Sequence, residues 1–114
     1  MPKDIKRGDI YWVDWNPARG NEQRGLRPAL VIQNDIGNKF SPTTIVAALT
    51  TAIEKPYPFL VKVTAKESGL PKDSTINLAV ILTVDKTRLT RKCGTLSDDK
   101  MSQVNEAIRA SLDL

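Results

Sequence analysis

Short segments in which apolar and polar positions alternate occupy the first three quarters of the chain, and this period of two is typical of β-strands. The segments that predict strands are Asp9 to Asn16, Pro28 to Asn34, Thr43 to Thr50, Phe59 to Val63 and Thr75 to Val84. Five or more strands of this length favour closure into a small barrel, because closure removes the unpaired edges of a sheet. The last segment is long enough to bend around the core of such a barrel.

The first two predicted strands distribute their apolar side chains in different ways. The first strand carries large side chains on both faces, with Tyr11, Val13 and Trp15 on one face and Ile10 and Trp12 on the other. The second strand, PALVIQN, has a continuous apolar centre. An uninterrupted apolar run of this kind predicts that both faces of the strand are buried.

The C-terminal quarter has a helical pattern instead. Ser97 is a suitable N-cap, and Asp98 and Asp99 in the first turn would interact favourably with the helix dipole. Apolar residues expected to contact the core follow at helical spacing, namely Met101, Val104, Ile108 and Leu112. A short helix is also expected near Asp85 to Arg88. The predicted fold is mainly β with α, a strongly twisted barrel with a C-terminal helix packed on it.

The length of 114 residues predicts a single domain over residues 1–114. The longest apolar runs, Ile45 to Leu49 and Leu78 to Leu82, are too short to cross a membrane. Residues Met1 to Arg7 carry charges but no apolar stretch behind them, so they do not have the pattern of a signal peptide. We therefore expect a cytoplasmic protein with no membrane partner.

Cysteine and histidine counts exclude several kinds of chemistry. The single cysteine, Cys93, cannot form a disulfide within the chain, and the sequence contains no histidine. A structural zinc site and a serine hydrolase site are therefore excluded, and Cys93 has no histidine to activate it. Acidic residues are scattered singly apart from Asp98 and Asp99, so a two-metal nuclease site has no support. We expect no cofactor, no metal and no role for Cys93.

The net charge of +4 and the pI of about 9.4 favour polyanionic partners. Positive charge is concentrated in two stretches of the sequence. The second stretch, formed by Lys86, Arg88, Arg91 and Lys92, is interpreted as a solvated face. The first stretch, with Arg19, Arg24 and Arg27, lies in a Gly-rich connection between two predicted strands.

This connection contains groups that could bind a phosphodiester. The segment Gly20 to Gly25 has the spacing of a phosphate-binding loop, but no Lys-Ser/Thr pair follows and a strand follows where a helix is needed, so a P-loop is rejected. Pro28 keeps the preceding Arg27 extended, and its guanidinium could donate two parallel hydrogen bonds to a phosphate. Glu22 and Gln23 would add a carboxylate and an amide, and two threonines at the end of the third strand, Thr50 and Thr51, would add hydroxyls. Spacing alone favours the ordinary alternative, a surface salt bridge between Arg27 and Glu22.

Three segments of the sequence resemble the MazF/PemK family of toxins. They are RGDIYWVD from Arg7, GNEQRGLRPALVIQNDIGN from Gly20 and SPTTIVAALT from Ser41. The combination of RGDIY, GxEQxGxRP and a threonine at the end of the third strand is specific to the family. The resemblance continues more thinly through KDS at Lys72, VDK at Val84 and the terminal helix, so it covers nearly the whole chain.

The resemblance implies a PemK/CcdB-type barrel related to SH3-like barrels, a homodimer that binds single-stranded RNA in a groove between subunits, and a cognate MazE-like antitoxin. It implies that Arg27 and Thr50 are the catalytic pair and that Glu22 takes part in catalysis or positions the loop. The residues expected to contact RNA are Asn21, Gln23, Arg24 and Thr51. The implied reaction is metal-independent transesterification, in which the ribose 2′-hydroxyl attacks its own phosphate and leaves 2′,3′-cyclic phosphate and 5′-hydroxyl ends.

The sequence departs from the family pattern at Ala79 and Val80, which stand where many relatives have a Glu-Gln pair. A polar contact to RNA is therefore expected to be missing there. Arg24 stands where small residues are common. Two alternatives use the same barrel: a non-enzymatic toxin similar to CcdB, which binds DNA gyrase, and an inert SH3-like module that binds peptides. Neither alternative requires Arg27 or Thr50.

Overall fold

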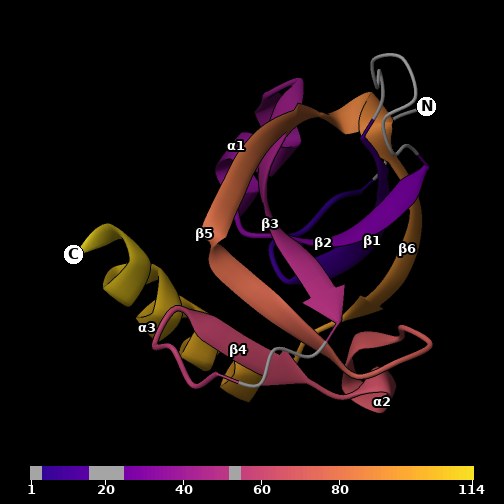
Figure 1. Ribbon diagram of the computed structural model, residues 1–114. Coiled ribbons are helices and arrows are strands. Elements are labelled where there is room, and N and C mark those ends of the chain that lie inside the picture. Colours follow the sequence, from indigo (N-terminus) through magenta and orange to yellow (C-terminus); the bar gives the residue numbers. More distant parts are fainter. Residues whose placement is uncertain (1–3, 16–24, 52–54) are drawn as a thin grey trace, which may run out of the picture.

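The computed structural model describes residues 4–15, 25–51 and 55–114 and has one six-stranded antiparallel sheet in the order β4-β5-β3-β2-β1-β6. The sheet curls strongly on itself, and α3 lies against β4 and the adjoining part of β5 (Figure 1). The elements are β1 (Asp9–Asp14), β2 (Leu26–Val31), α1 (Asp35–Phe40), β3 (Thr43–Thr51), β4 (Leu60–Val63), α2 (Ala65–Ser68), β5 (Ser74–Asp85), the 3₁₀ turn η1 (Lys86–Arg88), β6 (Leu89–Thr95) and α3 (Asp98–Leu112).

All five predicted strands and the terminal helix are present, and the mainly β fold is confirmed. The prediction for the second strand was wrong at both ends, because β2 starts at Leu26 and ends at Val31. After β2 the chain turns into α1, whose N-cap is Asn34: its side chain accepts a hydrogen bond from the N–H of Gly37. The sequence pattern did not predict α1. The sequence pattern also did not predict α2 and β6.

Two apolar cores lie on the two faces of the curled sheet. The first core lies under α3 and β4 and is formed by residues such as Ile10, Leu30, Ala47, Ile76, Leu78 and Val104. The second core is formed by Ile5, Tyr11, Val13, Ala29, Val31, Val46, Val84 and Leu89. Adjacent residues of β1 and β2 therefore enter different cores, which confirms the burial of both faces that was predicted for the second strand and shows the same arrangement for β1.

A bulge in β5 interrupts its pairing with β3. Ala47 lies opposite Ile81, but the next residue, Ala48, lies opposite Asn77, so the three residues 78–80 have no partner on β3. The side chain of Asn77 accepts a hydrogen bond from the N–H of Ala79 at 2.9 Å and stabilises this turn. The bulge redirects the second half of β5 and exposes Val80 at the surface.

The terminal helix begins as predicted and ends differently. The side chain of Ser97 accepts a hydrogen bond from the N–H of Lys100, which confirms it as the N-cap of α3. Val104 is buried, and Met101 and Ile108 pack against the first core. Leu112, in contrast, is 55% exposed, so its predicted core contact was wrong. The last turn of α3 extends past the sheet that the helix covers (Figure 1).

The interpretation of the second basic stretch as a solvated face was only partly right. Lys86 donates from its ammonium group to the carbonyl of Asn38, and the guanidinium of Arg88 donates to the carbonyl of Asp14 at 3.1 Å. Arg91 and Lys92 on β6 are exposed, as predicted. Two of the four cations therefore link η1 to other elements of the fold.

A seam between β1 and β6 joins two segments that are distant in the sequence. The carboxylate of Asp9 is buried, accepts a hydrogen bond from the hydroxyl of Thr95 at 2.9 Å, and forms an ion pair with Lys92 at 3.3 Å. Thr95 is also the register partner of Asp9. These contacts fix the register of the seam, because a slip by one residue would leave the buried carboxylate without its partners on β6.

A second close approach joins α2 to β6. Gly69 ends α2 in the left-handed conformation, with φ of +80°, and a Cβ atom there would lie 2.1 Å from the carbonyl oxygen of Cys93. A Cβ atom on Gly94 would lie 2.7 Å from the carbonyl oxygen of Ser68. The two backbones can therefore pack at this distance only because both positions lack a side chain.

None of the helices that the structure describes combines the length and the apolar character needed to cross a bilayer.

Candidate functional site

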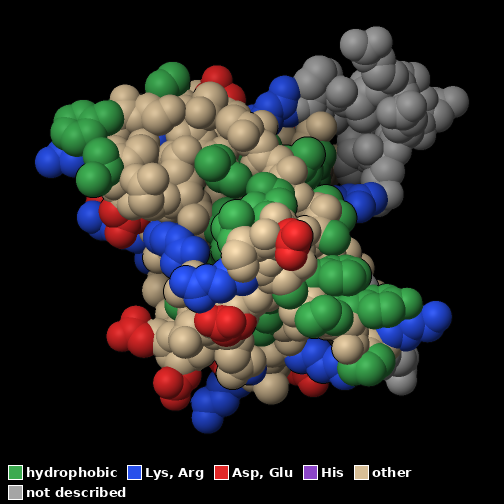
Figure 2. Space-filling model, turned by 90° about the vertical axis from the view of Figure 1, so that its left-hand side faces the viewer, with side chains coloured by type: hydrophobic (Ala, Val, Ile, Leu, Met, Phe, Trp, Pro, Cys, Tyr) green, Lys and Arg blue, Asp and Glu red, His purple; other side chains and the backbone are tan. Residues whose placement is uncertain are grey.

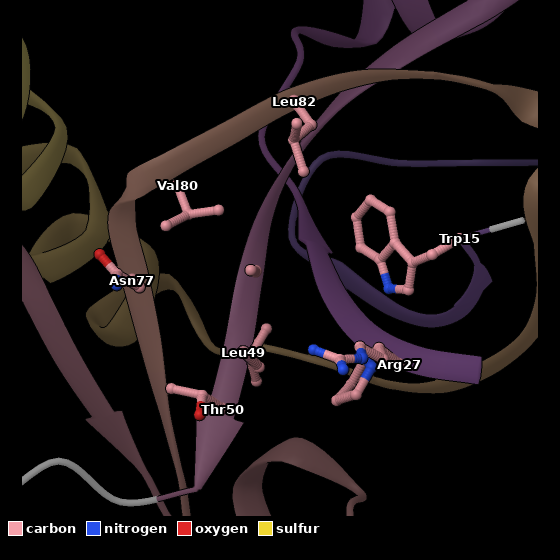
Figure 3. A pocket seen from close by; sticks show the side chains of 9 residues that line it. Trp15, Arg27, Leu49, Thr50, Asn77, Val80 and Leu82 are labelled. Atoms are coloured by element: carbon pink, nitrogen blue, oxygen red, sulfur yellow. The ribbon is translucent and has the colours of Figure 1, made fainter. Parts of the chain in front are cut away.

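The fold brings Arg27 and Thr50 together at one end of two neighbouring strands. The ladder between β2 and β3 ends where Ala29 lies opposite Ala48. In an antiparallel pair, two residues back along β2 correspond to two residues forward along β3, and those residues are Arg27 and Thr50. Beyond the ladder the strands are no longer paired, and both side chains line one hollow in the surface (Figure 3).

Described residues line two adjoining hollows at this end of the sheet, and the larger of these has a volume of about 520 Å³. Trp15 of the segment after β1, Arg27 of β2, Thr50 of β3 and Leu82 of β5 lie around it (Figure 3). Because side chains alternate along a strand, Arg27 and Thr50 lie on the same faces of their strands as the residues of the second core. The larger hollow is therefore an open continuation of that core, with the charged group of Arg27 at its edge.

A smaller hollow of about 230 Å³ adjoins the first one. It shares Pro28, Leu49 and Thr50 with the larger hollow and is also lined by Trp12, Thr51, Leu70, Pro71, Lys72 and Ser74. Thr51, which the sequence analysis predicted to contact RNA, lies here and is exposed. Thr50 is thus the hydroxyl residue that both hollows have in common.

The charges around the hollows suit an anionic ligand. Arg27 lines the larger hollow and Lys72 the smaller one, and both residues are exposed. Neither hollow is lined by an Asp or Glu in the part of the chain that the structure describes. A guanidinium beside a hydroxyl can bind the oxygens of a phosphate through charge-assisted hydrogen bonds. The arrangement can therefore hold a phosphodiester, with Arg27 and Thr50 contacting its oxygens.

Four of the predicted site residues, Asn21, Glu22, Gln23 and Arg24, lie outside the described residues. Their roles stay predictions. The sequence analysis missed the contribution of Trp12 and Trp15 to the hollows, since it treated both as strand residues. The signal that could have identified them was the presence of two indoles beside a basic loop.

The remaining chemistry of the described residues is limited. Burial raises the pKa of the Cys93 thiol, so the sulfur stays protonated at neutral pH and is a poor nucleophile. Within residues 4–15, 25–51 and 55–114, no three residues among Cys, Asp and Glu gather closely enough to hold a metal ion. Each of the two hollows therefore offers one cationic residue of the described chain, the hydroxyl of Thr50 and a tryptophan for binding.

Comparison with known proteins identifies relatives over nearly the full length of the chain. A family model described as PemK-like, MazF-like toxin of type II toxin-antitoxin system matches residues 6–112. Endoribonuclease EndoA of Bacillus subtilis (strain 168) is 53% identical over 111 residues, which is 96% of this chain and 96% of that protein.

Solved structures with the same fold are more distant in sequence. An endoribonuclease in complex with its cognate antitoxin from Mycobacterial species aligns with a TM-score of 0.81 at 24% identity, covering 96% of each chain. A MazE-MazF complex (Form-II) from Deinococcus radiodurans aligns with a TM-score of 0.81 at 22% identity, covering 98% of each chain. These structures confirm the predicted fold, including the C-terminal helix packed on the sheet.

Proposed function

This chain belongs to the PemK-like, MazF-like toxin family of type II toxin–antitoxin systems, and from that premise we propose that it is an endoribonuclease that cleaves single-stranded RNA. The observation that carries the proposal is the meeting of Arg27 and Thr50 in one hollow. A relative with 53% identity is named Endoribonuclease EndoA, which supports the same activity. A toxin that only binds DNA gyrase, or a peptide-binding module, would have no use for this pair of side chains.

The proposed reaction uses a nucleophile that belongs to the substrate. The ribose 2′-oxygen attacks the adjacent phosphorus, the new O2′–P bond forms, and the P–O5′ bond breaks. The 2′-hydroxyl loses a proton and the leaving 5′-oxygen gains one, which gives 2′,3′-cyclic phosphate and 5′-hydroxyl ends. The protein needs to align these atoms and to stabilise the charge that develops on the phosphate oxygens.

Arg27 is suited to charge stabilisation, since its planar guanidinium can donate two hydrogen bonds to the non-bridging oxygens. Because the guanidinium is a delocalised cation that suits charge stabilisation, we assign Arg27 an electrostatic role. The hydroxyl of Thr50 would orient one of the same oxygens. Glu22 is the candidate for the general base, and Asn21, Gln23, Arg24 and Thr51 are the candidates for further RNA contacts.

We also propose a homodimer and a MazE-like antitoxin as partners, in the cytoplasm. Val80 and Leu82 on β5 are each 41% exposed beside the larger hollow, which favours a partner surface over solvent. Figure 2 shows apolar side chains gathered across the middle of the side on which β5 and α3 lie, with charged side chains around them. Two relatives of the same fold are described as complexes with an antitoxin or with MazE. An acidic antitoxin segment would complement the charge of Arg27 and Lys72.

Cleavage of RNA in EDTA is the direct test of the proposed reaction. We expect purified protein to cut a long single-stranded RNA equally well with and without EDTA, because the proposed mechanism uses the 2′-hydroxyl and Arg27 in place of a metal. The new 5′ ends should accept a labelled phosphate from polynucleotide kinase without prior phosphatase treatment. Gel electrophoresis of the labelled products measures both properties.

DNA of the same sequence and RNA with a 2′-O-methyl group at the cleaved position are the matched controls, and both should remain intact. Loss of cleavage in EDTA with rescue by magnesium would contradict the mechanism, as would 5′ ends that label only after phosphatase. Intact RNA under all conditions would favour the gyrase-binding alternative, which a DNA gyrase inhibition assay then tests.

The hydroxyl of Thr50 is tested by a pair of substitutions. Thr50→Ala should lower kcat by roughly 10- to 100-fold, the loss expected for one hydrogen bond to a charged group, and Thr50→Ser should recover most of this rate. Thr83→Ala removes an exposed hydroxyl of β5 that lines neither hollow and should cleave like the original protein. If Thr50→Ala also cleaves at the original rate, the hydroxyl has no part in the reaction.

A further inference from the structure

The indole N–H of Trp15 is a buried polar group that the fold leaves without a partner. Among the described residues, its Nε1 is the only buried side-chain nitrogen or oxygen that forms no hydrogen bond. An indole N–H can only donate, and a buried donor without an acceptor destabilises the fold that contains it. Such groups are rare in native proteins, and each one calls for an explanation. The surroundings of Trp15 provide one.

Trp15 lies on the same face of the sheet as Arg27. Val13 of β1 is the register partner of Arg27 on β2. Trp15 follows Val13 by two residues, so its side chain points to the same face as that of Val13. Residues of neighbouring strands that are offset by two positions lie roughly 7–8 Å apart, within reach of an aromatic ring and a long side chain. Both side chains line the larger hollow together with Thr50, and the indole nitrogen lies on the side of the ring that faces Arg27 (Figure 3).

The position of the indole N–H is fixed before any ligand binds. The ring of Trp15 packs against the second core, and its nitrogen is shielded from water. A hydrogen bond from this N–H to a ligand would therefore not replace a hydrogen bond to water. A donor that is already oriented and already desolvated stabilises charge on a ligand at little further cost.

The groups around this nitrogen indicate which kind of ligand would complete it. A guanidinium, like an indole N–H, donates hydrogen bonds and cannot accept them, so Arg27 cannot satisfy the N–H of Trp15. No Asp or Glu of the described residues lines this hollow. Two donors that share one hollow suit a ligand group with acceptor atoms and negative charge, and a phosphate is such a group. Arg27 is exposed, so its flexible side chain can turn aside and admit a phosphate between the guanidinium and the indole.

We propose that the indole N–H of Trp15 donates a hydrogen bond to a non-bridging oxygen of the phosphate at the cleaved bond, which makes Trp15 a catalytic residue beside Arg27 and Thr50. The proposal rests on the ribonuclease function proposed above. Negative charge on the non-bridging oxygens increases as the O2′–P bond forms, so a donor to one of them is more strongly bound in the transition state than in the ground state. Every nucleotide carries this phosphate, so the contact raises the cleavage rate whatever the bases are.

Replacement of the indole N–H by sulfur tests this role. A chain synthesised with Trp15→benzothienylalanine keeps the shape of the ring and lacks the donor. It should lower kcat on an oligonucleotide that spans a mapped cleavage site by roughly 10- to 100-fold, the loss expected for one hydrogen bond to a charged group. KM should stay nearly unchanged, because the interaction is made mainly in the transition state. Trp15→Phe also lacks the donor and should lose at least as much activity.

Tyr57→Phe is the matched control. It removes the hydroxyl of an exposed aromatic residue that lines neither hollow, and it should cleave at the original rate. If the sulfur variant also cleaves at the original rate, Trp15 has no part in the reaction, although the ribonuclease function stands. If the original protein leaves RNA intact, the ribonuclease function itself is refuted.

Sulfur in place of one non-bridging oxygen of the same phosphate locates the contact. The two stereoisomers of this substrate each replace a different oxygen, and sulfur is a weak hydrogen-bond acceptor. With one isomer, Trp15→benzothienylalanine should cause no loss beyond that caused by the sulfur in the substrate, because the same hydrogen bond is already absent. With the other isomer, the full loss should remain. An equal loss on both isomers would show that the N–H does not contact these oxygens, and the proposal would be wrong.

The stability of the free protein separates this role from a structural one. Removal of a buried donor that has no partner should leave the midpoint of urea unfolding of the benzothienylalanine variant unchanged or raise it. A lower midpoint would show that the N–H of Trp15 forms a hydrogen bond within the fold, and it would overturn the proposal.

Discussion

Arg27→Ala is expected to lower the rate of RNA cleavage by roughly 10²- to 10³-fold or more, the loss typical of a donor that stabilises charge in a transition state. The guanidinium lines the hollow that also contains Thr50, so its removal takes away the charge proposed to lie against the phosphate. Arg27→Lys keeps the charge but loses the planar pair of donors, and it should remain strongly impaired. Single-turnover cleavage of a labelled oligonucleotide measures both variants.

Arg109→Ala is the matched control for Arg27→Ala. Arg109 is an exposed residue of α3, and its guanidinium pairs with Glu106 at 2.9 Å on the surface of that helix. Its loss should leave the cleavage rate unchanged, because it lines neither hollow. Circular dichroism should show the same fold for all variants. A folded Arg27→Ala protein that cleaves at the original rate would place the catalytic site elsewhere.

Gly69→Ala is expected to have the largest effect on stability, lowering the free energy of unfolding by about 2–5 kcal/mol. About 1–2 kcal/mol comes from a side chain in the left-handed conformation, since φ at Gly69 is +80°. A further 1–3 kcal/mol, roughly, comes from overpacking, because the new Cβ would lie 2.1 Å from the carbonyl oxygen of Cys93. Urea denaturation followed by tryptophan fluorescence measures the change.

Gly25→Ala separates the two contributions. Gly25 also has a positive φ, +97°, but an added Cβ would meet no atom of the described residues within 4 Å. This variant should lose only the conformational part, about 1–2 kcal/mol. If the two alanine variants are destabilised equally, the close approach between α2 and β6 contributes nothing to the stability of the fold.

Much of the fold could be predicted from the sequence where one pattern dominates a segment. β3 was predicted almost to the residue, because its apolar run is bounded by polar residues on both sides. β6 was missed because most of its side chains are exposed, including those of Arg91 and Lys92. Its sequence therefore lacks the alternation of apolar and polar residues by which the other strands were predicted. Its pairing with β1 comes from contacts across the fold, which a local pattern does not contain.

The candidate site was predictable in part and for different reasons at each residue. Arg27 and Thr50 stand out by their place in motifs, and the register of β2 and β3 brings them into one hollow. Trp12 and Trp15 could not be assigned to separate hollows, because that depends on which face of β1 borders which core. The bulge in β5, which exposes Val80 beside the site, has no signal of its own in the apolar run from Leu78 to Leu82.

The seam between β1 and β6 has a consequence for the cell that makes this protein. The hydroxyl of Thr95 and the carboxylate of Asp9 that it joins are 86 residues apart in the chain, so a growing polypeptide cannot close the sheet until most of its length has left the ribosome. The larger hollow also needs Leu82 of β5 as part of its wall. The site is therefore still incomplete while the nascent toxin is close to the messenger RNA that encodes it.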